Sequence, residues 1–143
     1  MMPRHCLVLV CALAALVAGP AAGWAADPHA KGATPARIAM GEKIELADYL
    51  VPGKTTVFDF FSDHCPDCRA LAPQIEKLHA TRADVAVVLV DIDRPGAKRI
   101  DWKSPVSEQY QLHSIPYFKI FGPDGKLQIE GDWENKAVMA RLQ

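Results

Sequence analysis

The sequence predicts an α/β fold in which a mixed β-sheet is covered by helices on both faces. Residues 55–61 and 85–90 are continuous runs rich in β-branched, aromatic and aliphatic side chains, which is typical of central strands buried on both faces. Strand-like and helix-like segments follow one another in the order β-β-α-β-α-β-β-α, and this alternation indicates helices packed against a sheet.

The first half of the domain leads through short elements to a central strand and a long helix. Its patterns predict an edge strand at 43–46, a helical turn at 47–50, a turn at 51–54, a central strand at 55–61 and a helix over about 65–82. Asp59 is the one charged residue in the central strand. Pro73 lies inside the helix, where it removes a hydrogen bond and bends the axis.

The second half continues the alternation. Its patterns predict a strand at 85–90, a helix from Pro105 to about residue 111 with Ser104 as its cap, a hairpin of strands at 117–121 and 126–130, and a helix at 134–142. Between the strand at 85–90 and the helix from Pro105, we expect residues 94–103 to be a solvated loop with Trp102 packing its base. The alternative is that this loop recognises a partner.

Residues 1–26 have the pattern of a secretory signal peptide. A short polar start with Arg4 precedes an apolar core at 7–18, a helix-breaking Gly-Pro at 19–20 and small residues near 23–25. The core is shorter than the roughly 20 residues that span a bilayer. We therefore expect cleavage and a periplasmic or secreted protein. The lesser alternative is a membrane anchor formed by an uncleaved signal.

The remaining chain predicts one domain behind a short linker. Residues 27–41 are rich in Ala, Gly and Pro without periodicity, which is typical of a flexible linker. Residues 42–143 are enough for a single core. The formal net charge is −1 at pH 7, so no basic field indicates binding to nucleic acid or an anionic membrane. We expect a monomer.

Two cysteines lie three positions apart at the predicted start of the long helix. Cys6 and Cys11 leave with the signal peptide, so Cys65 and Cys68 are the pair that remains. A disulfide between them closes a very small loop and constrains the unfolded chain little. At a helix N-terminus, free backbone N–H groups and the helix dipole favour a thiolate. The spacing therefore indicates thiol–disulfide exchange chemistry.

Two other readings of the cysteine pair stay open. One is a permanent structural disulfide, and the other is a metal site, which needs further ligands beyond the adjacent His64. Covalent haem attachment needs a histidine directly after the second cysteine, and Arg69 stands there.

Residues 58–68 combine a strand with the cysteine pair, Pro73 lies inside the helix that follows, Ile115-Pro116 precedes a strand, and Gly125 and Gly131 lie in and after the hairpin. In these features the sequence resembles the thioredoxin superfamily, with its active-site segment, kinked helix, cis-proline loop, and hairpin and closing glycines. The resemblance implies a thioredoxin-like fold with a central mixed sheet of four to five strands. It also implies exchange with protein disulfide or dithiol substrates, without a prosthetic group.

Roles for individual residues follow from the pattern and the resemblance. We expect Cys65, nearer the helix N-terminus, to be the nucleophile and the more exposed and more acidic thiol, with Cys68 resolving the mixed disulfide. Asp59 matches the buried carboxylate of the family, whose pKa burial should raise, and is the expected proton acceptor for Cys68. The alternative is an aspartate at the strand's end, satisfied by solvent or backbone.

Substrate contacts are expected beside the redox pair. The resemblance implies a cis bond before Pro116 and backbone pairing of Ile115 with the substrate, like an added strand. An ordinary proline at the start of a strand is the alternative. His64 stands where thioredoxins usually have tryptophan, and we expect it to contact the substrate. His113 is expected at the surface, with a place in the substrate groove as the alternative.

Some residues depart from the family pattern. Pro66-Asp67 replaces Gly-Pro between the cysteines, and Leu89 stands where many thioredoxins have a lysine near the buried aspartate. The negative charge of Asp67 should raise the pKa of Cys65, which favours a reductant because strong oxidants owe their power to a stabilised reduced form. A protonated His64 would act in the opposite direction.

The sequence thus favours an exported thiol–disulfide oxidoreductase that acts as a reductant. Its electrons would come from another thiol protein, for example one in the membrane. One alternative is a redox-inert binding module with a structural disulfide. Another is a reductase dedicated to one client, for example in cytochrome c assembly.

Overall fold

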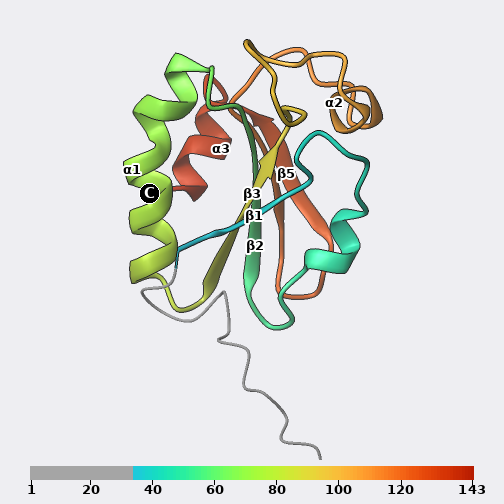
Figure 1. Ribbon diagram of the computed structural model, residues 1–143. Coiled ribbons are helices and arrows are strands. Elements are labelled where there is room, and N and C mark those ends of the chain that lie inside the picture. Colours follow the sequence, from blue (N-terminus) through green and yellow to red (C-terminus); the bar gives the residue numbers. More distant parts are fainter. Residues whose placement is uncertain (1–33) are drawn as a thin grey trace, which may run out of the picture.

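A five-stranded mixed sheet forms the centre of the molecule (Figure 1). The computed structural model describes residues 34–143, so the predicted signal peptide and residues 27–33 of the predicted linker lie outside the described residues. The strand order is β1-β3-β2-β4-β5. The strands are β1 (Ala36–Ile38), β2 (Thr55–Phe61), β3 (Val85–Asp91), β4 (Tyr117–Phe121) and β5 (Leu127–Asp132). The pairs β1–β3 and β3–β2 are parallel, whereas β2–β4 and β4–β5 are antiparallel.

Helices cover both faces of this sheet, which confirms the predicted fold class. The longest, α1 (Pro66–Thr81), packs on one face together with the C-terminal α3 (Lys136–Arg141). The 3₁₀ helix η1 (Leu46–Tyr49) and α2 (Pro105–Gln109) lie over the other face (Figure 1). In the part of the chain that the structure describes, no helix is long and apolar enough to cross a membrane.

Alternate residues of the central strands build two separate apolar layers. Phe58 and Phe60 of β2 belong to the layer beneath η1 and α2. Val57 belongs to the layer beneath α1 and α3, and so does Val87 of β3. Successive side chains of a strand point to opposite faces, so a strand buried on both sides must be apolar almost throughout. Asp59, on the Val57 side of β2, is the exception.

Most predicted elements are confirmed. β2 has the predicted bounds, and α1, β3, α2 and β4 differ from the predictions by at most one or two residues at an end. The first predicted strand, residues 43–46, is wrong. The backbone of Ile44 instead bonds to the side chain of Gln109, which accepts from its N–H at 3.1 Å and donates to its carbonyl at 2.7 Å. With these groups satisfied, the segment takes no partner strand.

The first strand of the sheet lies in the segment predicted to be a linker. Residues 36–38 pair with Val88, Leu89 and Val90 of β3. The linker prediction for 27–41 is therefore wrong at these positions. A strand of three residues carries almost no periodic signal, and its stability comes from pairing with a strand far along the chain.

Candidate functional site

The redox cysteines lie where several chain segments meet at one edge of the sheet. β2 and β3 end at this edge, and antiparallel β4 begins there. The segment after β2 leads to the cysteines, the segment after β3 carries residues 94–103, and Ile115-Pro116 precedes β4. Ligand and catalytic sites of open α/β sheets are found at the carboxyl ends of the parallel strands.

Cys65 and Cys68 form a disulfide at the start of α1. Their Cα atoms are 5.3 Å apart, as a helical first turn requires. Cys65 is the N-cap of α1, and its Sγ accepts a hydrogen bond from the backbone N–H of Cys68 at 3.1 Å. In the reduced protein, the same N–H and the helix dipole would stabilise a thiolate on Cys65.

The expectation that Cys65 is the more exposed cysteine is wrong for the oxidised state. The exposed fraction of Cys65 is 3%, and that of Cys68 is 7%. The carbonyl oxygen of Ile115 lies 3.6 Å from Cys65 Sγ and helps to cover it. Exposure therefore does not distinguish the two thiols, whereas position at the helix N-terminus still favours Cys65 as the nucleophile.

The structure brings Ile115 and Pro116 to the redox pair. The peptide bond between them is cis, as the resemblance implied. Both residues are buried, and the Ile115 carbonyl faces Cys65. A substrate that approaches Cys65 must pass beside this carbonyl, which is the arrangement that backbone pairing with a substrate needs. The pairing itself stays a prediction.

Asp59 is buried in the middle of β2, so the alternative of a solvent-satisfied aspartate at the strand's end is wrong. It is 6% exposed, and its Oδ1 has no hydrogen-bond partner among the described residues. Burial raises the pKa of Asp59 from 3.8 to about 7. A carboxyl group with this pKa can accept and return a proton near neutral pH.

A cavity of about 190 Å³ lies between the buried carboxyl group and the second cysteine. Asp59 and Cys68 both line it, together with Leu89 and Ile75. Leu89 stands opposite Asp59 in the parallel β2–β3 register. The cavity gives Asp59 a route to Cys68, and it has room for a water molecule.

Arg37 is a residue of the site that the sequence did not reveal. It lies on β1 and lines the same cavity as Asp59. Its Nη2 is 2.7 Å from the Oδ2 atoms of both Asp63 and Asp91. Its charge is thus shared between two other carboxylates. The signal was weak, because Arg37 stands in the three-residue strand within the predicted linker.

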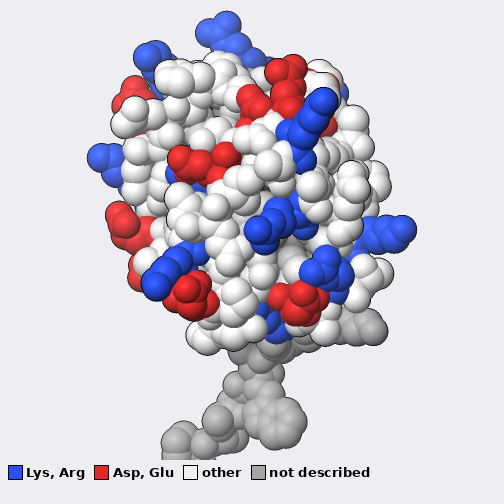
Figure 2. Space-filling model, turned by 180° about the vertical axis from the view of Figure 1, so that it is seen from behind, with Lys and Arg blue, Asp and Glu red and all other residues white. Residues whose placement is uncertain are grey.

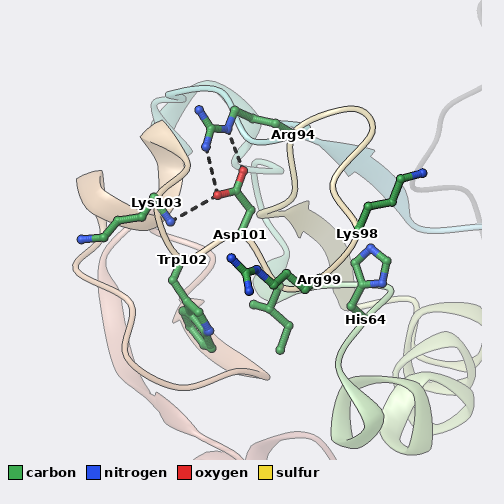
Figure 3. A pocket seen from close by; sticks show the side chains of 8 residues that line it. His64, Arg94, Lys98, Arg99, Asp101, Trp102 and Lys103 are labelled. Carbon is green, nitrogen blue, oxygen red and sulfur yellow. Dashed lines mark hydrogen bonds and ion pairs between the residues drawn. The ribbon is translucent and has the colours of Figure 1, made fainter.

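His64 faces residues 94–103. Its Nε2 lies 3.0 Å from the carbonyl oxygen of Ala97. A carbonyl only accepts, so Nε2 carries the proton in this bond. His64 is exposed and lines a cavity of about 840 Å³ formed with Arg94 and residues 98–103 (Figure 3). Its role in substrate binding stays a prediction.

Two expectations for nearby side chains have different outcomes. Trp102 is 38% exposed, so it does not pack the base of its loop as an interior residue. His113 is exposed, as expected, although it lines a cavity with Trp102. Within residues 34–143, no group of three or more His, Cys, Asp and Glu side chains is arranged to hold a metal ion.

Comparison with known proteins is consistent with this geometry. A family model described as Thioredoxin matches residues 45–143. A thioredoxin from Mycoplasmoides gallisepticum is 33% identical over 85 residues, which are 59% of this chain and 76% of that protein. A thioredoxin from Chlamydia trachomatis is 37% identical over 82 residues, or 57% and 70% of the two chains.

The solved structures extend the likeness to the fold. A mutant thioredoxin from Halobacterium salinarum superposes with a TM-score of 0.56 at 21% identity, covering 78% of this chain and 88% of its own. At this identity, the likeness concerns the arrangement of strands and helices alone.

Proposed function

The chain belongs to the thioredoxin family of thiol–disulfide oxidoreductases, and from this premise we propose that it is an exported reductant of protein disulfides. Cys65 and Cys68 are its redox centre. The signal-like pattern of residues 1–26 supports export. Asp67, between the cysteines, supports reduction of the substrate rather than its oxidation.

In the proposed reaction, Cys65 and Cys68 exchange two electrons with a substrate disulfide. The Cys65 thiolate attacks one substrate sulfur, which forms a mixed disulfide and releases the other substrate sulfur as a thiolate. Asp59 then accepts the proton of the Cys68 thiol. The Cys68 thiolate attacks Cys65 Sγ, closes the Cys65–Cys68 disulfide and releases the second substrate thiolate. The substrate is reduced and this protein is oxidised.

The observation that carries the proposal is the shared cavity of Asp59 and Cys68. A buried carboxyl group without a hydrogen-bond partner on Oδ1 destabilises a fold. A purely structural disulfide gains nothing from such a group. A cysteine that must lose and regain a proton does, so the cavity favours exchange chemistry over a redox-inert binding module.

Asp67 supports reduction over oxidation. It lies in the first turn of α1, between the cysteines, and is exposed. A negative charge there opposes the stabilising effect of the helix N-terminus on a Cys65 thiolate. A less stabilised thiolate corresponds to a less oxidising disulfide. We propose that another thiol protein, for example a membrane-borne one, returns the electrons.

A trapping experiment tests the proposal. In Cys68→Ser, the mixed disulfide on Cys65 cannot be resolved, so discrete adducts with substrate proteins should accumulate and disappear on reduction. Cys65→Ser is the matched control and should trap none. The redox potential of the wild-type pair, measured by equilibration with glutathione, tests the direction. A potential as high as about −120 mV would contradict a reductant. Absence of both adducts and disulfide reduction would leave the binding module as the better description.

A further inference from the structure

A second surface includes His64, the residue before Cys65 in the active-site loop. Its centre is the cavity of about 840 Å³ that His64 lines together with Arg94 and residues 98–103. His64 directly precedes Cys65, so one wall of this cavity belongs to the active-site loop. We call His64 and residues 94–103 the basic rim.

The basic rim is fixed to the active-site loop. The His64 ring donates to Ala97, and the His64 backbone N–H donates to Ser62 Oγ at 2.9 Å. Ser62 Oγ in turn donates to Asp93 Oδ2 at 2.6 Å, and Asp93 Oδ1 accepts the backbone N–H of Asp101 at 2.9 Å. These bonds set the position of the rim relative to Cys65 before any partner binds, which lowers the conformational-entropy cost of binding.

The charged side chains of the rim are mostly positive. Residues 94–103 hold four cationic side chains and one carboxylate, in a chain whose formal net charge is −1. Arg94 is paired with that carboxylate, Asp101, at 2.6 Å. Lys98, Arg99 and Lys103 are exposed, and no carboxylate of residues 34–143 forms an ion pair with them. On the face of the molecule that Figure 2 shows, acidic and basic side chains are interspersed.

Figure 3 shows how these groups are spread around the cavity. The Arg99 side chain extends between His64 and Trp102, while Lys98 projects outward above His64. Trp102 offers an exposed aromatic surface at the other side. A phosphate site brings its donors together around one small anion. Cations spread along a rim with an exposed tryptophan suit an extended acidic peptide better, because aromatic and cationic side chains anchor protein interfaces.

We propose that the basic rim binds an acidic segment of the protein whose disulfide Cys65 attacks. The inference rests on the proposed function, because it names the class of substrate protein: one with Asp or Glu residues close to its reactive disulfide. Charge complementarity steers such a substrate toward the rim and accelerates its encounter with Cys65.

Two charge-reversed variants test the rim against a matched control. Lys98→Glu/Arg99→Glu reverses two rim charges, whereas Lys77→Glu/Lys126→Glu reverses two exposed charges elsewhere. Lys77 lies in the C-terminal half of α1, and Lys126 lies in the β4–β5 hairpin at the opposite end of the sheet. Binding is measured by fluorescence anisotropy with a labelled cysteine-free peptide of alternating Glu and Gly, and with its Gln analogue. Reduction rates are measured with disulfide peptides that carry the same flanking residues.

We expect the wild type to bind and reduce the Glu peptide about tenfold better than the Gln peptide at low salt. The preference should shrink in about 0.5 M salt, disappear in Lys98→Glu/Arg99→Glu and persist in Lys77→Glu/Lys126→Glu. Equal binding of the two peptides by the wild type would overturn the inference, and so would loss of the preference in both variants. If Lys98→Glu/Arg99→Glu does not fold, Lys98→Gln/Arg99→Gln and the salt dependence of the wild type still test whether the rim binds acidic peptides.

The two proposals fail in different ways. If no peptide disulfide is reduced by any form of the protein, the proposed function is wrong, and anisotropy still decides whether the rim binds acidic peptides. If disulfides are reduced without regard to flanking charge, the proposed function stands and the rim is not a docking surface.

Discussion

Asp59 lies opposite Leu89 in the β2–β3 register, so the neighbouring strand offers an apolar side chain to a buried carboxyl group. Arg37 lines the same cavity, but its guanidinium is bound to Asp63 and Asp91. Burial is therefore the single cause that raises the pKa of Asp59 to about 7. We therefore expect a proton acceptor whose pKa is set by burial rather than by a nearby charge.

Replacement of Asp59 by asparagine should stabilise the protein at alkaline pH. The pKa of Asp59 is about 7 in the folded state and 3.8 when the group is unperturbed. Between these values the folded state holds a proton that the unfolded state has released, so stability falls as pH rises through this window. Above about pH 7, Asp59 is ionised in the folded state, and the full free-energy cost of burying its charge lowers the stability. Asp59→Asn should raise the free energy of unfolding by on the order of 3 kcal/mol at pH 8 and far less at pH 4, measured by urea denaturation.

Asp84 provides a control of the opposite sign. It is an exposed carboxylate, and the hydrogen bond from Arg82 lowers its pKa to about 2. Asp84→Asn should therefore not stabilise the protein at pH 8. Equal stability of Asp59→Asn and the wild type at pH 8 would show that the Asp59 carboxylate is solvated or paired in solution.

Introduction of a lysine opposite Asp59 should lower the pKa of this carboxyl. In Leu89→Lys, an ammonium group can reach the cavity that the leucine lines. An opposite charge within a few ångströms favours the ionised carboxylate. The pKa of Asp59, followed by NMR of its side-chain carboxyl carbon, should fall by about one unit or more. Leu127→Lys adds the same charge on the exposed part of β5 and should leave the titration in place. A shift of equal size in both variants would contradict a local effect.

Arg37 should stabilise the fold by pairing a buried carboxylate. The side chain of Asp91 is 4% exposed, and Arg37 Nη2 lies 2.7 Å from it. Loss of the cation leaves this carboxylate buried without its charge partner, so Arg37→Ala should lower the free energy of unfolding by about 2 kcal/mol. Arg82→Ala removes an ion pair with Asp84 in which both side chains are exposed. The free energy of unfolding should therefore fall by less than about 1 kcal/mol. Similar losses in the two variants, by urea denaturation, would count against the structural role of Arg37.

Local patterns were sufficient to predict the central part of the fold. β2 carries its own signal in a nearly continuous run of β-branched and aromatic residues, and α1 in apolar residues at helical spacing. Cys65, Cys68 and Asp59 lie on these elements, so the chemistry could be predicted together with them. Ile115 required the family resemblance, because its contact with Cys65 joins residues 50 positions apart.

The errors concern features that depend on distant partners. The segment at 43–46 alternates like a strand, but Gln109 bonds to the backbone of Ile44. β1 is too short to be recognised, and it forms because β3 offers an open edge. The burial of Cys65 depends on the same long-range contact with Ile115. Sequence periodicity reports which face of an element is apolar, and it does not report which distant group will lie against it.

Ser62 should couple the active-site loop to the basic rim. Its hydroxyl is fully buried, accepts the His64 backbone N–H and donates a charge-assisted bond of 2.6 Å to Asp93. Ser62→Ala removes both bonds and leaves Asp93 Oδ2 without this donor. The free energy of unfolding should fall by about 1–3 kcal/mol, and backbone amides of residues 62–64 and 93–101 should exchange faster with solvent.

Ser114→Ala is the comparison for this variant. Ser114 also donates to a carboxylate, Asp132 Oδ2 at 3.1 Å, but the pair is only part-buried. Its removal should destabilise the protein by less than about 1 kcal/mol and should leave amide exchange in residues 93–101 unchanged. If Ser62→Ala destabilises the whole protein without faster exchange in either segment, Ser62 supports the core and does not fix the rim to Cys65. If it accelerates exchange in both segments, and also weakens the preference for acidic peptides, then Ser62 positions the rim.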